Sequence, residues 1–516
     1  MISCVTAWRL GRLVGVRTVR VEGASLAGIG ADLVTIEARF VAMERDNTEV
    51  VLTGLPDTVT RESRGKLLSA LAETGIRLAP GRLHLNLVPA ARRKSGEILD
   101  LPLALAAAAA AGWIDPKLLE GALFLGELGI DGQLHAVPGG LAAALAAREA
   151  GLTRVFAPPA TAREATFIGE LEVFGAKHLL EVLRTLRGKP PFLRPLKPSL
   201  QAEQRPVATL DAVRGQEVAK EALVVAATGE HAMLLVGPPG TGKTMLARGL
   251  ESLMPPPTLE DRLEVTRVLS ATGRWPGGLV ARRPFRAPHH TVSYAGLVGG
   301  GPNVSPGEIT LAHRGVLFLD ELPEFRREVL EALRQPIEEG RILISRAARR
   351  TELPARFQLI CAMNPCPCGW RGHDRIPCTC APGAVIRYQN RISGPLLDRI
   401  ELRVDVQSPT LKQLLPSQET LVENSSAQLT LRVHAAREFA FARQGVIPNA
   451  RLEGSALDKF AAPRGEALEL LDTAMQAKAL SARAVQALRR VARTLADLEG
   501  ESEIGVQHLA AAIGLR

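Results

Sequence analysis

Residues 232–253 contain the segments AMLLV, GPPGTGKT and MLARGLESL in succession, and they decide the fold at the centre of the chain. The first is an apolar strand-like run, the second a turn rich in glycine, and the third a helical stretch. The turn fits G-x-x-x-x-G-K-[ST], whose backbone N–H groups and following helix surround phosphate oxygens. This arrangement predicts an ATP site. The residues expected around the phosphates are Gly237, Pro238, Pro239, Gly240, Thr241, Gly242, Lys243 and Thr244.

The chemistry of such a site also needs a magnesium ion and acidic partners. Lys243 is expected to reach the β- and γ-phosphates, and Thr244 to ligate Mg²⁺. The run GVLFLDE, residues 315–321, is a buried strand that ends in two acids. Asp320 is predicted to hold the Mg²⁺ water shell, and Glu321 to polarise the attacking water. The alternatives are a turn without a ligand and a strand that runs into an acidic helix cap.

Three nearly continuous apolar runs, AMLLV, GVLFLDE and FQLICAMN, predict a parallel α/β sheet within residues 207–408. Residues 1–185 alternate strand-like runs with Ala/Leu-rich helices and predict a separate α+β domain. Residues 186–206 contain five prolines and are expected to be a linker. Residues 409–516 are predicted to form a helical lid domain, since apolar residues recur at helical spacing in 480–498.

Composition excludes several classes of protein. The 516 residues are 46% hydrophobic and 23% charged, which excludes a wholly disordered chain. The net charge of +9 permits a polyanionic partner without requiring one, and 4% aromatic residues make base stacking an improbable basis for binding. The first residues lack the apolar core of a signal peptide, and the apolar run 101–111 is too short to span a bilayer. We therefore expect a cytoplasmic protein without a membrane partner.

Four of the six cysteines lie within fifteen residues, as the pairs Cys366/Cys368 and Cys378/Cys380. Four thiolates this close can surround one tetrahedral Zn²⁺, although structural zinc sites more often have two to four residues inside each pair. His373 is an alternative ligand. Reduced thiols and disulfides are the other interpretations, and metal binding is favoured over disulfides for a cytoplasmic protein.

The motifs GPPGTGKT and LFLDE resemble those of AAA+ ATPases. By this resemblance Asn364, at the end of FQLICAMN, corresponds to sensor 1 and would orient the lytic water. Arg399, in GPLLDR, resembles an arginine finger that would enter the neighbouring subunit's site. Arg483 resembles sensor 2. The alternatives are a surface salt bridge from Arg399 to Asp398 or Glu401, and a solvated helix face for Arg483.

Lys243 and Asp320 are 77 residues apart, from 320 − 243, which is more than a minimal AAA+ core needs. The segment FRAPHHTV and the glycines from Gly299 fit a hairpin inserted in this interval, as in the magnesium-chelatase branch. A second, basic hairpin is expected at residues 340–350, where Arg346, Arg349 and Arg350 would contact phosphates by charge alone. A polar turn exposed to solvent is the alternative.

Together with PGEITLAHRGVLFLDE, NPCPCG, ISGPLLDRI and the LSAR…VARTLADL pattern, these motifs are similar to the ComM/YifB family of magnesium-chelatase-like AAA+ proteins. Residues 1–185 resemble that family's N-terminal module, which is similar in fold to the proteolytic domain of Lon. The Ser and Lys positions of Lon fall near Ile98 and Ala142, and the neighbouring Lys94 and Ser95 precede the expected turn. Because proteolysis needs that pair, the module is interpreted as a non-catalytic scaffold or a DNA-contacting module.

The resemblance implies an ATP-hydrolysing motor that acts as a homo-hexamer on single-stranded or branched DNA. It would be a helicase that promotes branch migration during natural transformation and recombination. Two other functions stay open: an ATPase subunit of a metal chelatase, and an ATPase that unfolds protein. The N-terminal module and the cysteine loop are expected to argue against the chelatase, and the missing Ser–Lys pair against a protease.

Overall fold

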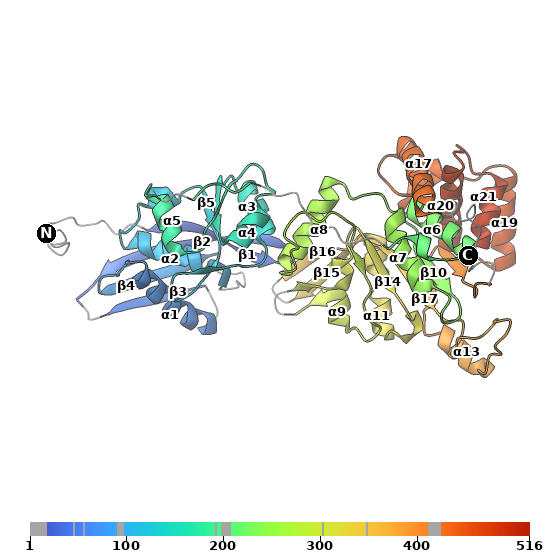
Figure 1. Cartoon of the computed structure of the whole chain (residues 1–516), viewed down its shortest axis with the longest axis horizontal. Helices are drawn as coiled ribbons and strands as arrows, with labels where there is room; N and C mark the ends of the chain where they lie inside the picture. Colours follow the sequence, from blue (N-terminus) through green and yellow to red (C-terminus); the bar gives the residue numbers. More distant parts are fainter. Residues whose placement is uncertain are drawn as a thin grey trace. The chain divides into compact units, whose positions relative to one another are not determined.

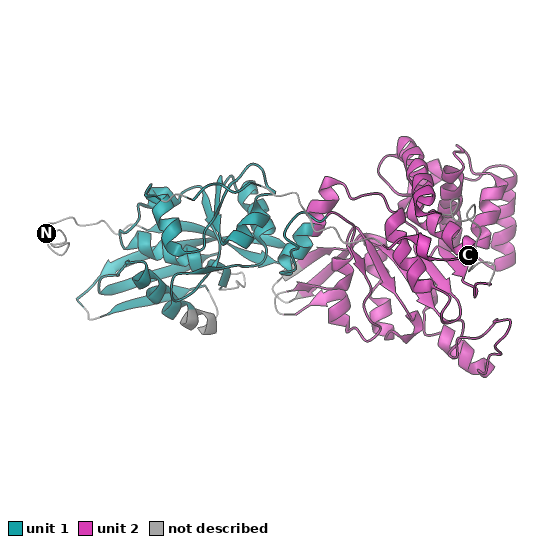
Figure 2. Ribbon diagram, viewed as in Figure 1, with its two compact units in different colours: residues 1–203, 266–280 teal, residues 204–265, 281–516 magenta. Residues whose placement is uncertain are grey.

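The chain forms two compact units in the computed structural model (Figure 2). The first consists of residues 1–203 and 266–280, and the second of residues 204–265 and 281–516. The structure describes residues 18–44, 47–54, 57–89, 97–190, 193–197, 208–301, 304–346, 349–410 and 425–516.

The segment 266–280 departs from the expected domain boundaries. It belongs to the first unit, although the residues on either side of it belong to the second. Ser270 lies inside the first unit: its carbonyl accepts from the Gly139 N–H at 3.1 Å, and its hydroxyl donates to the buried Glu164 carboxylate. Burial raises the pKa of Glu164 above its ordinary value, which the bond from Ser270 partly opposes.

The first unit is built on a mixed seven-stranded sheet in the order β3-β4-β2-β1-β5-β8-β9. The β1–β2 and β2–β4 pairs are antiparallel, and β3–β4, β1–β5, β5–β8 and β8–β9 are parallel. The predicted strands VRVEG, LVTIEARF and LHLNLVP form β1, β2 and β4. The strands are β1 (Val19–Ala27), β2 (Gly30–Ala42), β3 (Thr48–Thr53), β4 (Gly81–Val88), β5 (Ala122–Phe124), β8 (Arg154–Ala157) and β9 (Glu172–Gly175), with a small pair β6 (Glu127–Leu128) and β7 (Leu134–His135).

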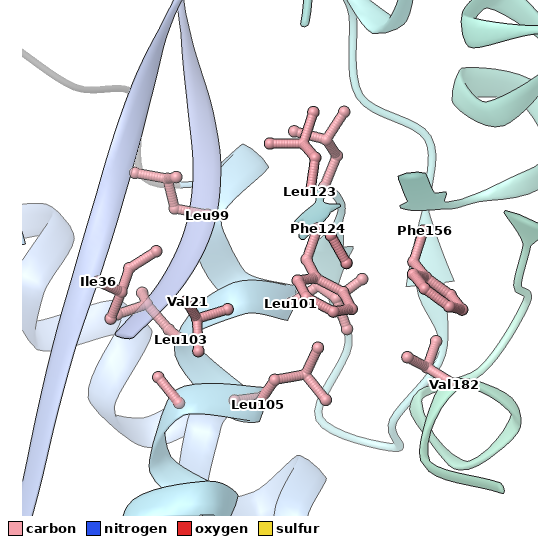
Figure 3. Close-up of a cluster of buried hydrophobic side chains, with 14 of the residues drawn as sticks. Val21, Ile36, Leu99, Leu101, Leu103, Leu105, Leu123, Phe124, Phe156 and Val182 are labelled. Carbon is pink, nitrogen blue, oxygen red and sulfur yellow. The ribbon is translucent and has the colours of Figure 1, made fainter. Parts of the chain in front are cut away.

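The core of the first unit lies where α2 packs on β1 and β2 (Figure 3). Almost every residue of α2 is buried, which accounts for its apolar, alanine-rich run. Phe124, Phe156 and Phe174 continue the core as a stack with centroid separations of 5.3 and 4.7 Å. The helices are α1 (Asp57–Glu73), α2 (Asp100–Ala110), α3 (Gly140–Glu149), α4 (Pro159–Ala165) and α5 (Leu179–Leu186).

The second unit contains a five-stranded sheet in the order β11-β14-β17-β10-β18, and every neighbouring pair is parallel. Its central strands β14, β17 and β10 are labelled in Figure 1. The predicted runs AMLLV, GVLFLDE and FQLICAMN form its three central strands, which are wholly buried. The predicted parallel α/β core is therefore confirmed. The strands are β10 (Met233–Val236), β11 (Phe285–Arg286), β14 (Val316–Leu319), β17 (Gln358–Met363) and β18 (Leu402–Asp405).

Two antiparallel hairpins interrupt the second unit where insertions are predicted. The first pairs β12 (Gly299–Gly300) with β13 (Ser305–Pro306), and the second pairs β15 (Arg341–Arg346) with β16 (Arg349–Pro354). The side chains of Arg346, Arg349 and Arg350 lie outside the described part of the structure. The helices before residue 410 are α6 (Glu217–Gly229), α7 (Lys243–Leu253), α8 (Leu259–Ala271), α9 (Tyr294–Val298), α10 (Glu308–Leu311), α11 (Arg327–Glu331), α12 (Arg334–Glu339), α13 (Pro382–Gln389) and α14 (Gly394–Leu397).

The C-terminal helices share one hydrophobic core with the parallel sheet, so the parts expected at 207–408 and 409–516 form a single compact unit. Helices α17 and α20 pack on α6. The buried His231, just before β10, contacts the Glu401 carboxylate and lies 2.7 Å from the Thr494 hydroxyl of α20. Burial alone would raise the pKa of Glu401, but His231 and Arg490 lower it. The helices are α17 (Ser426–Gln444), α18 (Gly454–Phe460), α19 (Glu466–Lys478), α20 (Ala482–Leu498) and α21 (Val506–Gly514).

Among the residues that the structure describes, no helix combines the length and the apolar character needed to cross a membrane.

Candidate functional site

The backbone conformation of the glycine-rich turn between β10 and α7 depends on its glycines. A Cβ on Gly237 would lie 2.1 Å from the Val406 carbonyl oxygen, so a larger residue has no room there. Gly240 and Gly242 have φ values of 78° and 88°, in the left-handed region that glycine adopts without strain. The turn therefore leads directly into the N-terminus of α7, where backbone N–H groups are free to bind phosphate oxygens.

Lys243 is the first residue of α7, and its ammonium is held inside the turn. Its Nζ donates to the Gly237 carbonyl at 2.7 Å, to the Pro238 carbonyl at 2.8 Å and to Asn364 Oδ1 at 3.2 Å. Burial lowers the pKa of Lys243, and the charges of Asp320 and Glu321 partly oppose this. The ammonium thus lies in the middle of the phosphate turn, with the two acids nearby.

The two acids lie directly after β14. The Thr244 hydroxyl donates to Asp320 Oδ2 at 2.8 Å, which places two hard oxygen ligands side by side. Such oxygens suit Mg²⁺, so the residues fit the ion that the motif predicts. Glu321 has a φ of 53°, which is uncommon for a residue with a side chain, and its carboxylate lies 3.1 Å from His290 Nδ1.

Strand order explains why residues far apart in the sequence meet here. Strand β17 lies between β14 and β10, and all three are parallel. Their carboxyl ends therefore share one edge of the sheet, where open α/β sheets bind ligands. The structure brings together five predicted residues, which are Lys243, Thr244, Asp320, Glu321 and Asn364.

The two predicted arginines meet at a different place. Arg399 Nη2 lies 2.7 Å from Glu338 Oε1, and Arg483 Nη2 lies 2.6 Å from the same oxygen. The Arg399 side chain is only 7% exposed. The alternative partners considered for Arg399 are wrong: Asp398 pairs with Arg516 and Glu401 with Arg490. The physical reason is that helix α12 brings Glu338 to Arg399, a contact that sequence proximity does not reveal.

Two residues of this region escape sequence reasoning. His290 belongs to the FRAPHHTV segment, which stands out in the sequence, but nothing there connects it to Glu321. Glu338 is one of two adjacent acids at the end of α12 and belongs to no motif. Both act through contacts between elements far apart in the chain, so only the fold reveals them.

The four clustered cysteines converge on one point. Their sulfur atoms all lie within 4.8 Å of one another. Cys366 Sγ is 3.4 Å from Cys368 Sγ and 3.6 Å from Cys378 Sγ, and the Cys368 N–H donates to Cys380 Sγ at 3.3 Å. A tetrahedron of thiolates at the usual Zn–S length has edges of about 3.8 Å. The cluster therefore has the ligand type and spacing of a tetrahedral metal site.

Two other residues, the alternative ligand His373 and the nearby cysteine Cys361, are not part of this cluster. His373 Nδ1 accepts the backbone N–H groups of Arg375 and Ile376 at 3.1 and 3.0 Å, so that nitrogen caps a turn. Cys361 is buried in β17, where burial raises the pKa of its thiol. Cys361 thus behaves as a small apolar residue of the core.

In the first unit, the positions compared with a protease carry no reactive group. Ile98 and Ala142 are both buried core residues. Lys94 and Ser95 lie outside the described residues.

The chain is similar to known proteins over nearly its whole length. It is 41% identical over 499 residues to the protein named YifB of Salmonella typhimurium, with 95% of each chain covered. It is 39% identical over 503 residues to the competence protein ComM of Haemophilus influenzae, again with 95% of each chain covered.

The chain belongs to the ComM/YifB family of magnesium-chelatase-like AAA+ proteins. Family models agree: residues 209–414 match "Magnesium chelatase, subunit ChlI" and residues 423–516 match its C-terminal part. Membership in this AAA+ family implies ATPase activity.

Two comparisons bear on the chelatase itself. Residues 40–161 match "Subunit ChlI of Mg-chelatase". The N-terminal part is expected to argue against a chelatase, and this match shows that it does not. The match to the magnesium-chelatase 38 kDa subunit of Cereibacter sphaeroides is narrower, at 28% identity over 216 residues, 38% of this chain and 58% of that protein. The likeness to ComM and YifB therefore covers far more of the chain.

Proposed function

We propose that this protein is an ATP-hydrolysing motor that acts on DNA, and that it promotes branch migration during natural transformation or recombination. The observation that supports ATP turnover is the meeting of Lys243, Thr244, Asp320, Glu321 and Asn364 at one sheet edge. The observation that supports DNA as the substrate is the likeness to a competence protein over 95% of both chains.

Each residue of the site has a defined task in hydrolysis. Lys243 and the N–H groups of residues 237–244 bind the phosphates, and Thr244 and Asp320 hold the metal. Mg²⁺, when bound, neutralises charge that develops on the phosphate oxygens. Glu321 accepts a proton from the attacking water, and Asn364 orients that water beside the Lys243 ammonium.

In this proposal, arginines of a ring of identical subunits supply further positive charge at the ATP site. In this proposal Arg399 enters the site of the next subunit in a homo-hexamer, and Arg483 senses the nucleotide. Both arginines pair with Glu338 within one chain. Assembly and ATP binding must therefore exchange the Glu338 contact for a phosphate contact, which is a favourable exchange for a guanidinium.

In this proposal the inserted hairpins contact the DNA. The β15–β16 hairpin pairs six residues with six, from Arg341↔Pro354 to Arg346↔Arg349, so its tip carries the arginine-rich sequence. Arginines at such a tip would bind the phosphate backbone without sequence readout. The first unit would act as a scaffold or a further DNA contact.

ATPase rates in the presence of different partners test this function. The proposal predicts stimulation by single-stranded or forked DNA, with an effect that weakens as salt rises. A Glu321→Gln protein controls for contaminating ATPases. Turnover that responds to unfolded protein or to a porphyrin, and is unchanged by DNA, would assign the motor to another substrate.

A chelatase ATPase subunit is the second candidate, because the matching family models carry the magnesium-chelatase description. It would use the same ATP site to drive metal insertion by a partner subunit. The porphyrin arm of the ATPase experiment separates it from the DNA motor.

We also propose that the four clustered cysteines bind Zn²⁺ as a structural cofactor. Cys366 lies two residues after Asn364, and the loop also packs on the phosphate turn: a Cβ on Gly369 would lie 2.8 Å from Pro239 Cδ. Gln389 Nε2, at the end of α13, donates to the Pro365 carbonyl at 3.3 Å. A bound zinc would therefore brace Asn364 and the turn together.

A further inference from the structure

The Glu321 carboxylate must be held in one orientation to act as a base, and its exposed position does not do this. Its side chain is 56% exposed, and its backbone is held in the left-handed region at φ 53°. A flexible carboxylate on an exposed side chain samples several rotamers, whereas a general base must be within hydrogen-bond reach of one water. Something must therefore restrict where this carboxylate points.

His290 contacts that carboxylate directly, with Nδ1 at 3.1 Å from Glu321 Oε2. A carboxylate has no hydrogen to donate, so Nδ1 can act on Glu321 only in a form of the imidazole that carries a hydrogen at that nitrogen. One oxygen is then occupied, and the other remains available to accept a proton from water.

The His290 ring is fixed by its own neighbours. Its centroid lies 4.0 Å from that of the His289 ring, with the two rings tilted by 34°, and it meets the buried Phe325 edge-on at 6.4 Å. The adjacent histidine has a different polar partner, since His289 Nδ1 lies 2.9 Å from the Thr291 hydroxyl. Of the two neighbouring imidazoles, His290 is thus the one turned to the acid.

The segment that carries His290 is also tied down at its base. It leaves β11 at Arg286 and returns to α10 at Glu308, and these residues form a two-fold ion pair with distances of 2.6 and 2.8 Å. This bidentate geometry is the strong form of the interaction. The rigid base keeps His290 at a constant place relative to β14, which ends beside Glu321.

We propose that His290 is a positioning residue for ATP hydrolysis, which sets the rotamer of the Glu321 carboxylate through Nδ1. This inference rests on the proposed role of Glu321 as the base. In this role His290 would act through Glu321 and not directly on ATP or the attacking water.

Steady-state ATPase kinetics of His290 variants test the inference. His290→Ala is expected to lower kcat about tenfold and to leave KM for ATP within about twofold, because a misplaced base slows chemistry without weakening binding. His290→Asn is expected to retain kcat within about threefold, because its side-chain nitrogen, like Nδ1, is one bond beyond Cγ and can donate. His289→Phe, which keeps an aromatic ring next to His290, is the matched control and should turn over at the normal rate.

The outcomes separate this inference from the role of the base. If Glu321→Gln abolishes turnover while His290→Ala is unaffected, or if His290→Asn is as slow as His290→Ala, His290 does not position the base. If Glu321→Gln turns over normally, the base assignment fails and His290 fails with it. ATP-binding titrations and thermal unfolding of each variant show whether a slow protein is folded, and a slow His290→Ala that no longer binds ATP also contradicts the positioning role.

Discussion

Lys243 and Glu321 carry opposite charges at the site, and their surroundings differ as well. Lys243 is buried and has three hydrogen-bond acceptors, so its charge is held at one point. Glu321 is exposed and is held by His290. A carboxylate in this setting can change its contacts during a cycle, which suits a group that handles water rather than one that only binds phosphate.

Replacing Glu321 by Gln should separate binding from hydrolysis. The amide keeps the size of the side chain but cannot take the proton, so turnover should fall by about 10²- to 10⁴-fold while ATP binding is retained. Nucleotide binding and ATPase rate are measured on the same preparation. Glu324→Gln is the matched control, since Glu324 pairs with Arg391 at 2.8 Å. Normal turnover by Glu321→Gln would remove Glu321 from the mechanism.

Asp100 predicts a pH dependence of stability in the first unit. Burial raises its pKa to about 7, although the Leu128 N–H and the charge of Lys66 oppose the rise. Because the folded-state pKa exceeds the unfolded one of about 3.9, the stability contribution is fully present below pH 4 and is lost as pH rises through 7. The full loss is about 4 kcal/mol.

Hydrogen exchange of β1 and β5 in the full chain measures this effect. After correction for intrinsic exchange, protection in the wild type should fall between pH 5 and pH 8. Asp100→Asn, which cannot ionise, should show a much smaller fall. The same pH dependence in both proteins would show that Asp100 does not control it.

At the level of helices and strands, the sequence predicts the features that depend on residues close together in the chain. Strands β10, β14 and β17 are continuous apolar runs, so their existence, direction and polar ends could be predicted. Strand β11 is two residues long, and β18 alternates buried and exposed residues, so neither has the apolar run that marks a buried strand. The pairings of Glu338 and His290 depend on how elements pack, which no spacing in the chain encodes.

The cysteine loop gives a prediction for one element. Replacing Cys378 by Ser should remove about one equivalent of zinc, because three thiolates and a hydroxyl bind Zn²⁺ more weakly than four thiolates. Elemental analysis of the purified protein measures the metal. Cys361→Ala is the control, since Cys361 lies in β17 outside the cluster. Wild-type protein without zinc, or Cys378→Ser with undiminished zinc, would contradict the assignment.

For the whole molecule, the predicted division into domains and the compact units agree only in part. The boundary between residues 203 and 204 does fall within the proline-rich stretch 186–206, but residues 266–280 pack with the first unit. Sequence composition does not predict this, because α8 is one continuous helix from Leu259 to Ala271 and contains no break at 265. The shared core of the sheet and the C-terminal helices is likewise a tertiary property.

Ring assembly predicts complementation between two inactive proteins. Arg399→Ala should bind ATP but hydrolyse it slowly, since the arginine acts on the neighbouring subunit. In a mixture with Glu321→Gln, a site formed by an Arg399→Ala subunit and a Glu321→Gln neighbour has both the acid and the arginine. Turnover should therefore recover on mixing. If the mixture is no faster than its separate components, the trans-acting role is refuted.

Strand displacement on a three-stranded DNA junction tests the central claim most directly. We expect the wild-type protein to move the branch point when ATP is hydrolysed, and the Glu321→Gln protein to bind the same DNA without moving it. A wild-type protein that hydrolyses ATP at full rate on this junction and leaves every strand in place would contradict the account.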